Sequence, residues 1–285
     1  MCIRDSVDPD LTTGWLGRHL ASVPPMHPSP VLRGIGISSG LAKALVGAPQ
    51  TLPIADPANY GIGGSATTRT ARMAMLRSNY EGSANPLRAA ALDAVGTIDL
   101  LSRLNITAYA PAGGAVYPNT SFGRGLRSVA ALIKADIGIE AASVDIGGWD
   151  THAAQDPNAG QMATLMTGFA QAMTAFWTDV MNTGQRVTLV AVSEFGRNAI
   201  ENGSQGTDHG RGTVMFAMGK GIAGGRVYTN GWPGLEAAQL EDRRDLRVTL
   251  DYRDVLAEIV QRRLENNNLG YIFPGWRPTF RGVTR

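Results

Sequence analysis

The feature that most constrains the fold is a β-branched apolar run at residues 187–192, which stops abruptly at polar residues. Runs of this kind form strands that are buried on both faces of a parallel sheet. Glu194 and Arg197 stand where the strand is expected to end, and a Gly- and Asn-rich loop then leads to Asp208 and His209. Because ligands bind at the carboxyl ends of the strands in open α/β sheets, this order of residues favours a binding site.

A second apolar run repeats this arrangement upstream. Residues 142–146 are predicted to form a short strand, and Asp150 and His152 follow it after a Gly-Gly pair. Between the two strands, apolar residues recur at three- and four-residue steps over 158–182, which indicates a helix packed on the core. A strand, a helix and a strand in this order predict a right-handed crossover and a parallel sheet with helices on both faces.

Further segments are expected on either side of these two strands. Capped or amphipathic stretches predict helices, and two more apolar runs predict strands; the helices are placed at 13–20, 65–80, 85–104, 123–135 and 251–264, and the strands at 31–37 and 213–218. The first six residues have neither the charged nor the apolar region of a signal peptide. We interpret 1–6 as a non-native leader and expect a single domain over 7–285 that lacks its N-terminal portion.

Composition excludes several classes of protein. A net charge of +2, with 44% hydrophobic and 18% charged residues, is typical of a soluble globular protein. There is no basic stripe of the kind that binds nucleic acid, so no nucleic-acid partner is expected. No apolar run approaches the roughly 20 residues that a membrane span needs. Cys2 is the single cysteine, which excludes an intrachain disulfide but not export.

The two acid–imidazole motifs are candidate metal ligands. Carboxylate and imidazole together suit Zn, Mn or Fe(II) better than Ca. The alternative is that each Asp caps a loop and each His binds a buried backbone carbonyl. His19 and His27 have no acidic neighbour in the sequence and are interpreted as structural.

Two charged residues at the end of the 187–192 run have open roles. Glu194 is a candidate metal ligand or general base, or else it pairs with Arg197 or Arg211. Arg197 is a candidate for holding a phosphate or sulfate through its fork of donors, or else it pairs with Glu201.

These motifs resemble those of the bacterial "domain of unknown function 1501" family, which is similar in fold to the alkaline phosphatase and sulfatase superfamily. The resemblance covers most of 10–276. The matching pieces are Gly-Trp-Asp-Thr-His at 148–152 with Gln155, Ser-Glu-Phe-Gly-Arg at 193–197, Gly-Thr-Asp-His-Gly at 206–210 and Asp-Tyr-Arg-Asp-Val at 251–255.

The resemblance implies an α/β fold of the alkaline phosphatase-like type, a three-layer α/β/α sandwich with a mainly parallel sheet. Asp208 and His209 would correspond to the superfamily's adjacent ligand pair, and Asp150 and His152 to the other ligand strand end. Family members usually carry a twin-arginine export signal, which implies a periplasmic or secreted full-length protein. No histidine follows His209 in this chain, so a complete two-metal site is not expected.

The function expected from these observations is metal-dependent hydrolysis of a small anionic phosphate or sulfate ester. A divalent ion, Zn or Mn, would be held by four ligands, with Glu194 as a further ligand or base and Arg197 steadying the anionic group; the ligands are Asp150, His152, Asp208 and His209. The alternatives are a non-catalytic secreted protein that binds or assembles through the same fold, and a mutase.

Overall fold

The computed structural model describes residues 10–28, 30–82, 84 and 86–285, so the leader expected at 1–6 lies outside the described residues. The described chain forms two compact units. The N-terminal unit is Thr13–Ile146 with Ala172–Thr183, and the C-terminal unit is Gly147–Gln171 with Gly184–Arg285 and the short segment 10–12. The single domain expected over 7–285 stays a prediction.

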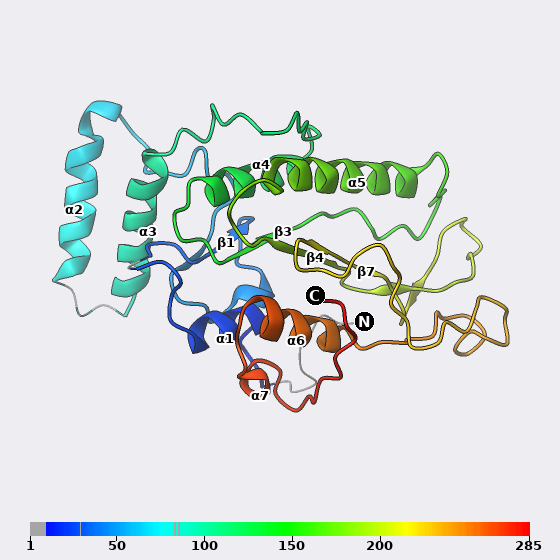
Figure 1. Cartoon of the computed structure of the whole chain (residues 1–285). Coiled ribbons are helices and arrows are strands. Elements are labelled where there is room, and N and C mark those ends of the chain that lie inside the picture. Colours follow the sequence, from blue (N-terminus) through cyan, green and yellow to red (C-terminus); the bar gives the residue numbers. More distant parts are fainter. Residues whose placement is uncertain (1–9, 29, 83, 85) are drawn as a thin grey trace. The chain divides into compact units, whose positions relative to one another are not determined.

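The N-terminal unit is built on a parallel sheet in which β1 (Gly34–Ile37) lies between β2 (Thr51–Pro53) and β3 (Ala141–Val144). Figure 1 shows its helices α2 (Arg69–Glu81) and α3 (Arg88–Ser102) standing next to each other. This combination of helices with a parallel sheet confirms the α/β class. The helical elements are α1 (Trp15–Ser22), η1 (Lys43–Leu45), η2 (Ala66–Thr68), α2 (Arg69–Glu81), α3 (Arg88–Ser102) and α4 (Ser121–Lys134).

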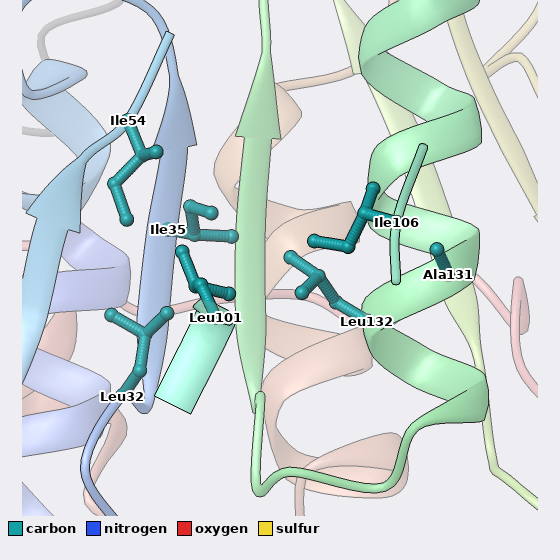
Figure 2. Packing of buried hydrophobic residues seen from close by; sticks show 7 residues of the cluster. All are labelled: Leu32, Ile35, Ile54, Leu101, Ile106, Ala131 and Leu132. Carbon is teal, nitrogen blue, oxygen red and sulfur yellow. The ribbon is translucent and has the colours of Figure 1, made fainter. Parts of the chain in front are cut away.

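The core of this unit lies where the sheet meets α3 and α4. Figure 2 shows the buried cluster, which consists of Leu32, Ile35, Ile54, Leu101, Ile106, Ala131 and Leu132. Thr120 caps the N-terminus of α4, and its hydroxyl accepts from the Gly123 N–H at 3.0 Å. Gly125 lets the helix approach the sheet, since a Cβ there would lie 2.7 Å from Val144 Cγ1. The apolar stripe predicted for this helix is thereby confirmed as its core-facing side.

A buried ion pair fixes β1 against β3. Arg33 precedes β1 and Glu140 precedes β3, and the guanidinium contacts both carboxylate oxygens, at 2.7 and 2.9 Å. Their side chains are only 3% and 6% exposed. Arg33 also donates to the carbonyl of Leu20 at 2.9 Å, so the pair joins α1 to the sheet. A bidentate contact of this kind adds geometric specificity to the charge attraction.

α5 (Gln161–Val180) contributes its residues up to Gln171 to the C-terminal unit and the rest to the N-terminal unit. The helix predicted from the periodic segment at 158–182 is confirmed, with observed bounds Gln161–Val180. Within the described residues, neither this helix nor any other has both the length and the apolar character that crossing a bilayer requires. The other elements of the C-terminal unit are β4 (Thr188–Val192), β5 (Gly196–Arg197), β6 (His209–Gly210), β7 (Met215–Gly219), α6 (Tyr252–Arg263) and α7 (Leu269–Ile272).

The strand predicted at 187–192 exists as β4, but its expected environment was wrong. β4 pairs antiparallel with β7, with Val190 opposite Ala217, and every residue of the strand is only half-buried. β3 pairs instead with β1 in the other unit, so the expected β3–α5–β4 crossover into one parallel sheet is not formed by the described pairs. The reason is the short β5–β6 ladder, which turns the chain back so that β7 returns beside β4 in the opposite direction.

Two buried carboxylates of α6, Asp254 and Glu258, hold the C-terminal segment of the chain against the helix. Asp254 accepts from the guanidinium of Arg281, at 2.6 and 3.0 Å, and from the Trp276 indole at 3.1 Å. Glu258 accepts from the backbone N–H groups of Arg281, Gly282 and Thr284, at 2.7 to 2.9 Å. Residues 276–284, which follow the last helix of the chain, are therefore held against α6.

Candidate metal centre

The two acid–imidazole motifs meet because the segments that carry them lie side by side in the C-terminal unit. Backbone hydrogen bonds join Ala154 to Ser204 and Gln155 to Gln205, each at 2.9 Å. The loop that contains Gly206 packs so closely on the other segment that a Cβ at Gly206 would collide with the backbone of His152. This pairing, and not two neighbouring strands of one sheet, brings the motifs together.

Three of the predicted ligands converge on one point. His209 Nε2 lies 2.7 Å, and His152 Nε2 3.0 Å, from the same oxygen of Asp150, Oδ1. One ligand atom from each residue lies within 4.8 Å of the other two. The imidazoles stack with their centroids 5.0 Å apart. All three side chains are about half exposed, at 62%, 47% and 49% for Asp150, His152 and His209, so water and a small solute can reach them.

Asp208 lies outside this trio and behind His152. Its Oδ1 is 3.1 Å from His152 Nδ1, the ring nitrogen opposite the one that faces Asp150. The amide of Asn202 donates to the same oxygen at 3.0 Å and to the carbonyl of His152, also at 3.0 Å. Arg244 lies 3.9 Å from the other carboxylate oxygen. Asp208 is thus held against the imidazole and not beside the other ligand atoms.

The electrostatics keep both carboxylates ionised. The hydrogen bond from His209 holds the pKa of Asp150 below its usual value, with the charges of His152 and Arg197 acting in the same direction. The hydrogen bond from Asn202, followed by that from His152, lowers the pKa of Asp208. Ionised carboxylates are acceptors only, so each one can bind a cation or accept from an imidazole N–H.

Phe195 and Arg197, which follow β4, contact two of the three converging residues, His209 and Asp150. The ring of Phe195 stacks on His209 at 4.2 Å, with 11° between the planes, and the Arg197 guanidinium lies 4.9 Å from the Phe195 centroid. Arg197 donates to the carbonyls of Thr207 and Trp149 and lies 3.5 Å from Asp150 Oδ1. Arg197 therefore does not pair with Glu201, the alternative considered from the sequence. Its contacts instead join the two segments that carry the acid–imidazole motifs. Its predicted contact with an anionic group stays a prediction.

None of the other residues considered is among the three converging ligands. Glu194 is exposed, and its carboxylate makes no hydrogen bond or ion pair with the described residues. Of the partners considered for it, Arg211 instead pairs with Glu241. Trp149 lies edge-on to Phe169 of α5, with 6.3 Å between the centroids, in keeping with a packing role. His19 is buried, and that burial lowers its pKa.

Sequence reasoning missed Asn202, which organises the loop between β5 and β6. Its side-chain oxygen accepts from the N–H groups of Ser204 and Gly206, at 2.9 and 3.2 Å, while its amide nitrogen holds Asp208. An Asn followed directly by Gly in a loop is a turn signal, and an Asn side chain bonded two residues onward is its usual form. That signal predicts the turn, but not the contact with Asp208.

The donor set fits a divalent transition metal. Two imidazole nitrogens and one carboxylate oxygen are the ligands that Zn prefers, and Mn accepts the same groups. Three protein ligands leave coordination positions open for water and substrate, as in catalytic rather than structural zinc sites. The stacked rings and the shared Oδ1 show that the three ligand atoms already face one another.

Comparison with known protein families identifies a match over most of the chain. The family model described as "Protein of unknown function (DUF1501)" covers residues 10–270. The chain belongs to this family. No curated protein and no solved structure matches it. The matched region includes the three converging ligands together with Asn202 and Asp208. Because the family's description names no activity, the chemistry must be argued from the site.

Proposed function

We propose that this protein is a metal-dependent hydrolase of small phosphate or sulfate esters, built on an alkaline phosphatase-like three-layer sandwich and exported to the periplasm or secreted in its full-length form. The observation that carries the proposal is the approach of two imidazole Nε2 atoms to one oxygen of Asp150. The exposure of the three side chains supports it further, because an ester must reach the ligands.

Each residue has a distinct part in this proposal. Asp150, His152 and His209 would hold Zn or Mn, and Phe195 keeps the His209 ring in place by stacking. A divalent ion supplies a Lewis acid that polarises the ester oxygen and lowers the pKa of water. Glu194, exposed at the end of β4, takes the proton of the attacking water. Arg197 sets a fixed positive charge beside Asp150 that steadies the anionic group, because charges oriented in advance need no reorganisation during reaction.

The proposal is tested with a panel of aryl phosphates and aryl sulfates. The chain loaded with Zn or Mn should release the phenol, EDTA should stop the reaction, and added metal should restore it. Glu194→Gln should lower kcat by about 100-fold or more, in the range typical of a lost general base. Metal-loaded protein that hydrolyses no member of the panel would favour a non-catalytic binding or structural protein on the same fold.

We assign Asp208 a positioning role in this site in place of the ligand role that the sequence predicts. Its ionised carboxylate only accepts, so once an ion took the place of a proton at Nε2, the contact at 3.1 Å would hold the remaining His152 proton on Nδ1. Nε2 would then direct its lone pair at the ion. Carboxylates that hold the second nitrogen of a metal-binding histidine fix its tautomer and orientation in this way.

Asp208→Ala is therefore expected to weaken metal binding by about 10- to 100-fold without abolishing it. Asp208→Asn should weaken it less, because the amide keeps an acceptor oxygen for Nδ1–H. Titration with Co²⁺, followed by its visible absorption, measures both affinity and ligand geometry; the spectrum should stay that of the wild type once saturated. Glu201→Gln, which removes an exposed charge nearby, is the control. A complete loss of Co²⁺ binding in Asp208→Ala would make Asp208 a ligand.

A further inference from the structure

A cavity of about 510 Å³ lies in the N-terminal unit. The residues of the metal centre belong to the C-terminal unit. The wall of the cavity is formed by the loop 57–63, by Arg69 at the start of α2 and by the end of α3 with the following residues, 101–107. Pro57 and Leu101 in its wall are buried, so it is backed by the packed part of the unit. Its size falls in the range of small-molecule sites.

Three side chains that line the cavity have hydrogen-bond donors to offer. Arg69, Arg103 and Tyr60 form no hydrogen bond or ion pair through their side chains with the described residues. Arg69 is partly buried and Arg103 is exposed, and neither forms an ion pair with a carboxylate of the described residues. Burial raises the pKa of the Tyr60 hydroxyl, which therefore remains protonated and able to donate.

No carboxylate of the described residues pairs with the guanidinium of Arg69 or Arg103. None of the described residues that line the cavity is acidic. Asp56, next to the loop, is already bound by the Ala58 N–H at 3.0 Å and by the Asn59 amide at 2.7 Å. Asp99, one helical turn before Arg103, pairs with Arg77 at 3.1 Å. The described residues that line the cavity therefore carry two positive charges and no negative one.

We propose that this cavity binds a small molecule through a phosphate or sulfate group. Guanidinium groups match the geometry of oxyanions with two parallel N–H donors, and the Tyr60 hydroxyl adds a third donor. Free phosphate is much smaller than the cavity, which leaves room for the organic part of an ester. The proposal rests on Arg69, Arg103 and Tyr60 alone and does not depend on a metal at Asp150, His152 and His209.

The test is isothermal titration of the chain, kept in EDTA at constant ionic strength, with inorganic phosphate and with phenyl phosphate. Arg69→Gln and Arg103→Gln should each weaken binding by about 10- to 100-fold, as expected when a charge-assisted hydrogen bond is lost. Tyr60→Phe keeps the ring and should weaken binding by about 2- to 10-fold. Arg124→Gln, an exposed change in the same unit, should bind as the wild type does.

Two results separate this site from the metal centre. Phosphate binding in EDTA that survives His209→Ala supports the cavity, and binding that disappears in that variant overturns the assignment. Equal affinities for the wild type and Arg69→Gln, or no binding of either probe, also overturn it. Tighter binding of phenyl phosphate than of phosphate identifies an ester as the ligand, and equal binding identifies the free ion. Circular dichroism of each variant confirms that the fold is retained.

Discussion

His209→Ala should bind neither Zn nor Mn under conditions in which the wild type retains the ion through dialysis. The substitution removes one of the three ligands. The lost atom, His209 Nε2, is the imidazole nitrogen closer to Asp150 Oδ1, at 2.7 Å. The effect of the substitution should exceed the roughly 10- to 100-fold weakening expected from losing an outer carboxylate such as Asp208. The measurement is metal content per chain after dialysis. The fold should survive, because the His209 side chain is 49% exposed and lies outside the buried clusters.

The matched control is His27→Ala, which removes an exposed imidazole from the other unit. It should retain the wild-type metal content. His152→Ala should behave as His209→Ala does, because both rings present Nε2 to the same oxygen. Equal metal content in the wild type and in both ligand variants would remove the basis of the hydrolase proposal and leave the fold and the family assignment intact.

The longer helices and strands could be predicted from the sequence because each is a local pattern. The stripe of α4 and the periodic run of α5 show which side faces the core. Strand direction could not be predicted in the same way. The run at 187–192 is apolar enough for either kind of sheet, and its antiparallel pairing with β7 follows from the turn made by β5 and β6. The short strand β2 was missed because its Pro-rich surroundings resemble a loop.

The positions of Asp150, His152 and His209 after two strands predict that they converge, although in one parallel sheet, which is not what forms. What brings them together is the backbone pairing of the two loops, such as that of Gln155 with Gln205. The place of Asp208 could not be inferred. Side-chain direction alternates predictably only in a regular strand, and in this loop it is set by Asn202.

The second large effect is expected at Asp179, a buried carboxylate near the end of α5 that periodicity alone does not distinguish. Its side chain is fully buried. Tyr109 and Tyr117 donate to Oδ2 at 2.7 and 2.8 Å, and the Ala112 N–H donates to Oδ1 at 2.7 Å. Lys134 of α4 forms an ion pair with it. The cluster ties the irregular segment 109–117 to two helices within the N-terminal unit.

Asp179→Ala should lower the free energy of unfolding by about 3–5 kcal/mol, because removing one partner of a buried pair leaves the other charge and the donors unmatched. Urea unfolding followed by circular dichroism measures the change. Asp99→Asn is the control, since its pair with Arg77 is exposed and should contribute less than about 1 kcal/mol. A change of less than 1 kcal/mol for Asp179→Ala would show that the cluster does not stabilise the unit.

The pH dependence of Asp179→Asn gives an independent check on this cluster. Burial alone would raise the pKa of Asp179, but hydrogen bonds from Lys134, the Ala112 N–H and both tyrosines outweigh it and hold the pKa below its usual value. A carboxyl whose pKa is lower in the folded state stabilises the fold above its unfolded pKa, about 3.9, and loses that contribution as the pH falls through the folded value. The stability gap between the wild type and Asp179→Asn should therefore be constant from pH 5 to 7 and narrow below about pH 4. A gap that widened on acidification would mean that Asp179 is protonated in the folded protein, and the Lys134 ion pair would then not be what holds the cluster together.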